Sequence, residues 1–190
     1  GIVLSASGVA AFLACSGNAT IAKINTTTKA VTSTVPVLSN PLSLALTPDG
    51  TKLWMTQPAA SKAAVLVVAS NVLTSITVGT NPDGVAVTTD GSAVWVTNNA
   101  GSISVISTAT NTVSTTISVG NIPAWVTMSP DGGRAWVTRY GGSAVNVYDT
   151  ASQALVSSLT VGTGPRGLAI SPDGTRAWVA DSDSDQLTVI

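Results

Sequence analysis

The chain has 190 residues, 44% of them hydrophobic, which is enough apolar material for one domain, residues 1–190, with a substantial core. The formal net charge is −1 and only 9% of the residues are charged, so the basic surface that nucleic-acid binding requires is missing. The apolar runs are too short for a membrane-spanning helix, and the single cysteine, Cys15, excludes an internal disulfide.

A turn motif that ends in Asp-Gly recurs along the chain. Its glycine advances in steps of 41, 41 and 42 residues, and a tryptophan stands four positions after each glycine. The turns occupy residues 47–50, 88–91, 129–132 and 171–174, and the aromatic residues are Trp54, Trp95, Trp136 and Trp178. A period of about 42 residues predicts a repeat architecture.

The first unit, residues 1–42, is a degenerate copy of the same repeat. Gly8 and Phe12 stand 42 positions before the glycine and the tryptophan of the next unit. Three further complete units are expected at 43–83, 84–124 and 125–166, followed by an incomplete fifth unit at 167–190.

Each unit contains four short β-rich runs separated by turn residues. In the third unit these runs are expected at residues 85–88, 93–97, 102–106 and 112–119. Connections this short permit only antiparallel neighbours, since a parallel crossover needs a dozen or more residues. Each unit is therefore predicted to be a four-stranded meander.

The second run of each unit is apolar on consecutive residues, as in Val94-Trp95-Val96 and Ala135-Trp136-Val137. A half-exposed antiparallel strand would alternate apolar and polar residues, so both faces of these strands must be covered. Small sheets that cover one another on both faces are the blades of a β-propeller. The sequence therefore predicts an all-β fold, a β-propeller of four-stranded antiparallel blades.

Several phrases resemble the YVTN-type repeat propellers of bacterial and archaeal surface proteins. They include Val94-Trp95-Val96-Thr97-Asn98, the segment 105–113 and the segment 167–174. The likeness covers nearly the whole chain, with Trp where that family's motif has Tyr. The resemblance implies a propeller, usually of seven blades and often exported, with no shared catalytic residues. An extracellular, periplasmic or cell-surface location is the expectation that follows.

The number of blades is left open by the sequence. The predicted strands amount to about 4.75 blades, because the last unit lacks its outermost strand. Either the chain closes a five-bladed ring or it forms an arc of a larger, seven-bladed type of propeller. The arc is favoured because both ends of the chain fall where a larger array would be cut, and an arc would expose an apolar blade face.

Function is expected where one unit departs from the repeat, since positions shared by every unit serve the fold. The turns after the second strand differ between units, whereas the Asp-Gly turns on the opposite face barely vary. Variation confined to one face is typical of a binding surface on a scaffold. The candidate ligand-binding residues of this variable-loop face are Asn98, Asn99, Arg139 and Tyr140.

A second candidate site lies where the first strand of each unit begins. After a recurring proline, Trp125 takes a place that other units give to Ser or Gly. The first strand lines the axis of a propeller, so Trp125, with Asp83 and Arg166 from neighbouring units, is expected at the mouth of the channel. Such a group predicts a small-ligand pocket. A bulky ring that only fills the axis is the alternative.

Three carboxylates stand at alternate positions in the last unit: Asp181, Asp183 and Asp185. This spacing is one way to present oxygen ligands to Ca²⁺. Gln186 stands where an EF-hand requires glycine, so a solvated acidic turn is the competing interpretation.

Catalysis is constrained by composition, because the chain has no histidine and one cysteine. A Ser-His-Asp triad, a histidine metal site and a thiolate cluster are all excluded, and no cofactor is expected. Three hypotheses remain: a non-catalytic scaffold for protein or ligand binding, a surface-layer-like unit that assembles with its own copies, and a propeller enzyme of the lactonase or lyase type.

Overall fold

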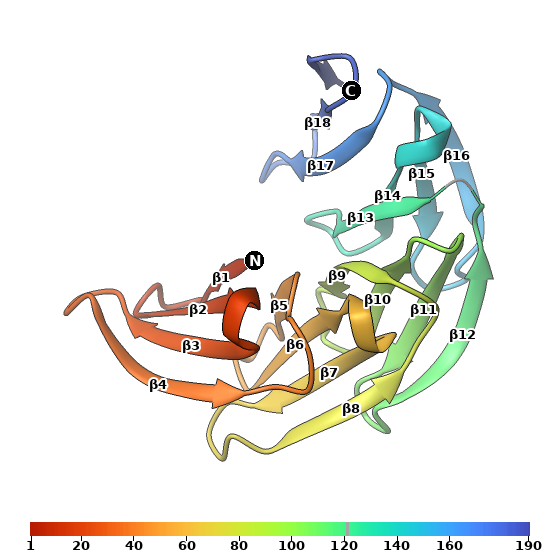
Figure 1. The fold of residues 1–190 in the computed structure, drawn as a ribbon. Helices are drawn as coiled ribbons and strands as arrows, with labels where there is room; N and C mark the ends of the chain where they lie inside the picture. Colours follow the sequence, from red (N-terminus) through yellow and green to blue (C-terminus); the bar gives the residue numbers. More distant parts are fainter. Residues whose placement is uncertain (121) are drawn as a thin grey trace.

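The repeats fold into five antiparallel sheets, seen in a computed structural model that describes residues 1–120 and 122–190 (Figure 1). Four sheets have four strands and the last has three. The strands of the first two sheets are β1 (Ile2–Leu4), β2 (Ala10–Cys15), β3 (Thr20–Asn25), β4 (Ala30–Pro36), β5 (Leu44–Leu46), β6 (Lys52–Gln57), β7 (Lys62–Val67) and β8 (Leu73–Thr77). The remaining strands are β9 (Pro82–Val87), β10 (Ala93–Asn98), β11 (Ser102–Ser107), β12 (Thr112–Ser118), β13 (Pro123–Met128), β14 (Arg134–Arg139), β15 (Ala144–Asp149), β16 (Leu155–Thr160), β17 (Pro165–Ile170), β18 (Ala177–Asp181) and β19 (Gln186–Val189).

Within each sheet the strands lie in chain order, so every sheet is a meander. The first strands of successive sheets pack against one another, β1 on β5, β5 on β9, β9 on β13 and β13 on β17. These strands form the inner edge of a fan of sheets (Figure 1). The all-β propeller fold predicted from the sequence is confirmed.

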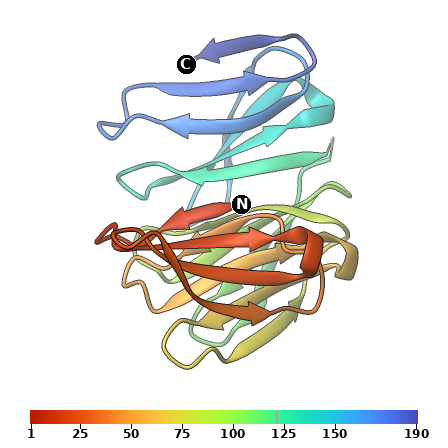
Figure 2. The same ribbon diagram turned by 60° about the vertical axis from the view of Figure 1, so that its left-hand side comes forward.

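The sheets do not close into a ring. Figure 1 shows the first and the last sheet on opposite sides of an opening, and Figure 2 shows the same separation from the side of the first sheet. Of the two arrangements that the sequence allowed, the structure is therefore the arc of blades and not the five-bladed ring. No helix in the described residues is both long enough and apolar enough to cross a membrane.

The repeated tryptophans pack between neighbouring sheets. Trp54 packs with Val85, Val94 and Val96 of the third sheet, and Trp95 packs in the same way with the fourth sheet. Both rings are fully buried. Burial on both faces of the middle sheets is what the uninterrupted apolar runs of β6 and β10 require.

The Asp-Gly turns are held by one hydrogen-bond pattern. In the second sheet the Asp49 carboxylate accepts hydrogen bonds from the Thr47 hydroxyl and from the amide and hydroxyl of Thr51, while Gly50 has φ +71°. These bonds, led by the one from Thr47, hold the pKa of Asp49 below its ordinary value. Only glycine adopts such a φ without strain, which explains its place in the motif.

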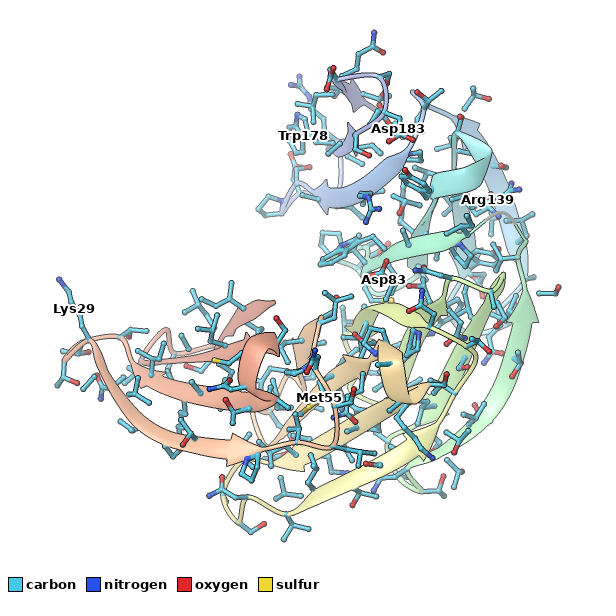
Figure 3. All side chains as sticks on the ribbon, in the orientation of Figure 1. Lys29, Met55, Asp83, Arg139, Trp178 and Asp183 are labelled. Carbon is cyan, nitrogen blue, oxygen red and sulfur yellow. The ribbon has the colours of Figure 1, made fainter. Side chains whose placement is uncertain are left out.

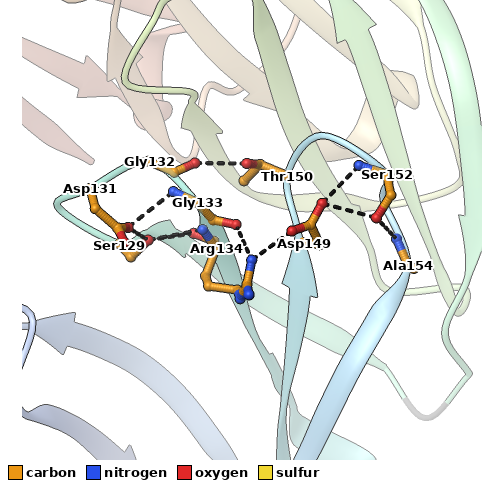
Figure 4. A network of polar contacts seen from close by, with 9 residues as sticks. All are labelled: Ser129, Asp131, Gly132, Gly133, Arg134, Asp149, Thr150, Ser152 and Ala154. Carbon is orange, nitrogen blue, oxygen red and sulfur yellow. Dashed lines mark hydrogen bonds and ion pairs between the residues drawn. The ribbon is translucent and has the colours of Figure 1, made fainter.

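The same face carries an ion pair in the fourth sheet. Figure 4 shows Arg134 donating to the Asp149 carboxylate at 2.6 Å, next to the turn in which the Ser129 hydroxyl donates to Asp131. The Thr150 hydroxyl donates to the carbonyl of Gly132 and ties the next turn of the sheet to the first. The turns on this face share one stabilising pattern, whereas the turns on the opposite face differ in sequence between units.

A buried threonine links each middle sheet to its neighbour. The Thr97 hydroxyl accepts a hydrogen bond from the amide of Gly84 in its own sheet and donates to the carbonyl of Ala124 in the next, both at 2.8 Å. Thr56 and Thr138 make the equivalent pair of bonds. We call these three residues the threonine bridges.

Candidate functional site

The inner strands present two variable positions at the axis of the arc, directly after the recurring proline. Position 1 holds Leu42, Asp83, Ala124 and Arg166 in successive units, and position 2 holds Ser43, Gly84, Trp125 and Gly167. The threonine bridges bind the backbone at these positions: Thr56, Thr97 and Thr138 donate to the carbonyls of Asp83, Ala124 and Arg166. The contacts that join the sheets therefore also set where the variable side chains stand.

All of the residues at these two positions except Gly84 line a pocket of about 360 Å³. Its volume lies at the lower end of the range that small-ligand sites occupy. The walls are mostly apolar and include Leu42, Ser43, Asp83, Ala124, Trp125 and Arg166. The structure thus brings together Asp83, Trp125 and Arg166, the three residues that the sequence placed at the channel mouth.

Arg166 is the second residue of β17, and its side chain is held over an aromatic ring. Its guanidinium carbon lies 4.7 Å from the centre of the Tyr140 ring, which is in the turn after β14. The Tyr140 hydroxyl donates a hydrogen bond to Asp183 at 3.1 Å. A cation held on the face of a ring keeps the N–H groups at its edge available for other partners.

Asp83, in β9, has a half-buried carboxylate with little hydrogen bonding. Its nearest hydrogen-bonding partner is the side-chain amide of Asn99, at 3.5 Å. Burial raises the pKa of Asp83, and the Asn99 contact and the charge of Arg166 oppose this shift only in part. Within residues 1–120 and 122–190 the one ion pair joins Arg134 and Asp149, so Asp83 and Arg166 face the pocket without pairing to each other. Figure 3 shows Asp83 on the inner side of the arc.

Trp125, in β13, supplies an open aromatic wall. Its side chain is 38% exposed, whereas Trp54 and Trp95 are fully buried between sheets. Its amide donates to the Thr138 hydroxyl at 3.0 Å, which fixes the backbone that carries the ring. An exposed ring on a fixed backbone is a suitable surface for an apolar group of a ligand.

Two residues assigned to the variable-loop face lie at the ends of their strands, below the turns. Asn98 is fully buried at the end of β10, where its amide donates to the hydroxyls of Ser102 and Ser104, so its side chain is not at the surface of this face. Arg139 is half-buried at the end of β14 and does not line the pocket. Side chains at this strand end turn inward beneath the next turn, whereas Asn99 and Tyr140, one residue later, reach the pocket residues.

The carboxylates of the last unit do not gather into one group. Asp181 is 1% exposed, and one of its oxygens accepts a hydrogen bond from the Thr188 hydroxyl. Asp183 points to Tyr140, and Asp185 sits at the turn with φ +52°. Among the described residues no three acidic, histidine or cysteine side chains gather into a group that could hold an ion.

Other residues of the pocket were not singled out from the sequence. Gly1, Ile2 and Leu44 line it from the first two sheets. The position that would hold the recurring proline of the first unit precedes Gly1, so the proline could not be used to mark this inner strand. Ser43 and Leu42 do follow such a proline, and their register with Trp125 and Arg166 was the signal that would have found them.

Comparison with known proteins shows the fold. No family model matches the chain, and no curated protein matches it. Hydrazine synthase of Kuenenia stuttgartiensis is similar with a TM-score of 0.89 at 24% identity, over 94% of this chain and 54% of that one. A protein of unknown function from Desulfotomaculum acetoxidans DSM 771 has a TM-score of 0.85 at 20% identity, over 100% of this chain and 67% of that one. The chain thus spans about half and two thirds of these proteins, and it shares with them the β-propeller architecture.

Proposed function

We propose that this protein is a non-catalytic β-propeller module that binds a small ligand in the pocket at its axis. The observation that carries this function is the meeting of Asp83, Trp125 and Arg166 from three successive sheets in one pocket of about 360 Å³. Two opposite charges beside an exposed ring, on strands fixed by the threonine bridges, suit orientation of a ligand more than support of the fold.

A screen with a matched variant tests the proposal. A panel of amino acids, amines, organic acids and sugars is added to the wild-type protein and to Trp125→Ala, and binding is followed by thermal shift. Ligands of the pocket stabilise the wild-type protein and lose this effect in Trp125→Ala. Leu155→Ala is the control, because Leu155 is 55% exposed on the outer strand β16. A panel in which no compound distinguishes Trp125→Ala from Leu155→Ala refutes the function.

We further assign the chain to the YVTN-type propellers, with an exported or cell-surface location. The support is the repeated phrase typified by Val94-Trp95-Val96-Thr97-Asn98 and the polarity carried by Ser, Thr and Asn with few charges. Fractionation of the native host tests the location: the proposal expects the protein in the extracellular, periplasmic or surface fraction, and a cytoplasmic pool as the main one contradicts it.

A second candidate function is assembly of copies through the open sheet faces. On the last sheet Leu187 and Val189 are 62% and 55% exposed, on the face that also carries Trp178 (Figure 3). On the first sheet Ile2 and Leu4 are similarly exposed. By register these faces correspond to the two halves of the interface that Trp54 makes with the third sheet, so a second copy is the natural occupant.

The measurement for this candidate is native mass over a range of concentrations. Assembly predicts oligomers that grow with concentration and are lost in Leu187→Lys, whereas Leu155→Lys on the outer strand leaves them unchanged. A monomer at every concentration excludes assembly and leaves the ligand-binding function untouched.

A further inference from the structure

We propose that the axial pocket recognises a free α-amino acid, with its ammonium group at Asp83, its carboxylate at Arg166 and its side chain against Trp125. This inference rests on the proposed ligand-binding function and adds the chemical class of the ligand. It follows from what each of the three side chains lacks in the structure.

Arg166 lacks an acceptor. No hydrogen bond joins its guanidinium group to any other described residue, although the face of the group is held by the Tyr140 ring at 4.7 Å. The planar fork of N–H donors is therefore positioned and unused. A carboxylate is the group that matches this fork with two parallel hydrogen bonds.

Asp83 lacks a cation. Its carboxylate is half-buried, its contact with Asn99 is long at 3.5 Å, and no ion pair forms with Arg166. An acid in this condition carries a desolvation cost that a cation can offset. A ligand ammonium at Asp83 supplies that cation, because the guanidinium of Arg166, held over the Tyr140 ring, forms no ion pair with Asp83.

Trp125 lacks an apolar partner. Its side chain is 38% exposed, and the same pocket is lined by the apolar residues Leu42, Leu44 and Ala124. Burial of an apolar or aromatic ligand group against this wall removes the exposed surface from water. The small pocket volume, about 360 Å³, suits a single amino acid better than a folded partner.

The two charges together select a zwitterion over simpler ions. A purely anionic ligand at Arg166 would meet the carboxylate of Asp83, and a purely cationic ligand at Asp83 would meet the guanidinium of Arg166. A molecule that carries both signs on one carbon satisfies both residues at once. Electrostatic complementarity of this kind is a source of specificity.

Three matched compounds test the inference: phenylalanine, phenethylamine, which lacks the carboxylate, and 3-phenylpropionate, which lacks the ammonium group. Each is titrated into the protein and followed by calorimetry and by tryptophan fluorescence, and the part of the fluorescence change that is lost in Trp125→Ala is assigned to Trp125. Phenylalanine is expected to bind at least about tenfold more tightly than either analogue, since each charged hydrogen-bonded contact is worth about a factor of ten or more.

Two conservative variants assign the charges. Asp83→Asn is expected to bring phenylalanine down to the affinity of 3-phenylpropionate, and Arg166→Gln to bring it down to that of phenethylamine. Asp185→Asn, which changes an exposed acid outside the pocket, leaves all three affinities unchanged. Circular dichroism confirms that each variant is folded.

The outcomes distinguish failure of the amino-acid assignment from failure of the ligand-binding function. Equal affinities for the three compounds, or a phenylalanine preference that survives both variants, overturn the amino-acid assignment while Trp125-dependent binding continues to support a ligand pocket. No binding of any of the three overturns the amino-acid assignment as well, and the broader panel with Trp125→Ala then decides the ligand-binding function by itself.

Discussion

Asp83 keeps a carboxylate where burial opposes its ionised form. Because burial raises its pKa in the folded protein, ionisation of Asp83 costs stability at neutral pH. We predict that Asp83→Asn raises the free energy of unfolding at pH 7, by less than about 1 kcal/mol because the side chain remains partly hydrated. A gain of stability in Asp83→Asn would indicate that the carboxylate is retained for binding and not for folding.

The pH dependence gives the sign of this effect. The folded-state pKa lies above the ordinary value of 3.8, so the wild-type protein loses stability relative to the variant as pH rises from about 3.8 through the folded-state pKa. Chemical denaturation of both proteins at pH 7 and pH 3 checks this, with Asp185→Asn as the control. A variant that is less stable than the wild type at pH 7 would show that Asp83 supports the fold.

Sequence reasoning located the pocket residues because they break a repeat. Arg166 at position 1 and Trp125 at position 2 differ from the residues of the other units, and both line the pocket. Asn98 also stands at a variable position, yet it is buried and donates hydrogen bonds to Ser102 and Ser104. Whether a strand's last side chain turns inward or outward depends on the turn that covers it, and the local pattern of residues does not carry that information.

At the scale of the strand, the threonine bridges are buried polar contacts that join neighbouring sheets. Thr97 is fully buried and its hydroxyl satisfies one amide and one carbonyl from two different sheets. Thr97→Val keeps the shape but leaves both backbone groups unpaired, so we predict a loss of about 2 to 3 kcal/mol in the free energy of unfolding. Equilibrium denaturation in urea measures it.

Thr97→Ser provides the matched control. Serine retains both hydrogen bonds and loses one methyl group, which costs about 1 kcal/mol. If the valine variant is no less stable than the serine variant, the hydroxyl makes no net contribution and the sheets are joined by apolar packing alone.

The inner strands approach one another so closely that a single methyl group matters. A Cβ atom at Gly84 would lie 2.8 Å from the carbonyl oxygen of Ala124 and 3.0 Å from the Cα of Trp125, both backbone atoms of the next sheet. We predict that Gly84→Ala destabilises the protein by about 1 to 3 kcal/mol, because the two strands must move apart. Thermal or urea denaturation gives the value.

The equivalent change in the last sheet is the comparison. Gly167 occupies the same position of its unit, and a Cβ atom there would have no atom within 4 Å. Gly167→Ala should therefore change stability by no more than about 0.5 kcal/mol. Equal losses at both sites would mean that glycine is required by the strand itself and not by the neighbouring sheet.

For the whole molecule, stability is expected to be uneven along the arc. The third sheet is covered on both sides, and Val94, Trp95 and Val96 are fully buried. The last sheet has three strands, and Leu187 and Val189 of its edge strand β19 are mostly exposed. In a linear repeat array each unit is stabilised mainly by its neighbours, so sheets at the ends open first.

Native-state hydrogen exchange tests this gradient. Amides of β10 and β11 are predicted to be the most protected, and those of β18 and β19 to exchange fastest, by at least about a hundredfold. Uniform protection across all five sheets would instead indicate that the arc unfolds as one unit or that its ends are covered by association.

The fold was predictable from the sequence to the level of the blade. The period of about 42 residues, the Asp-Gly turns and the apolar runs around Trp95 and Trp136 specify a meander covered on both faces, and the structure has it. The open arc was not determined in this way, since identical local units pack equally well in a ring or an arc. Curvature depends on small angles between sheets, and no residue pattern reports them.

The register of the inner strands has a consequence for how such a protein can diversify. Each of the last four sheets contributes one side chain at position 1, and these residues, Leu42, Asp83, Ala124 and Arg166, line the pocket. If the pocket binds a ligand as proposed, substitution at any one of these positions changes recognition without altering the buried tryptophans or the Asp-Gly turns. A duplicated unit with a different residue at position 1 would add a new chemical group to the pocket, so specificity could evolve one blade at a time.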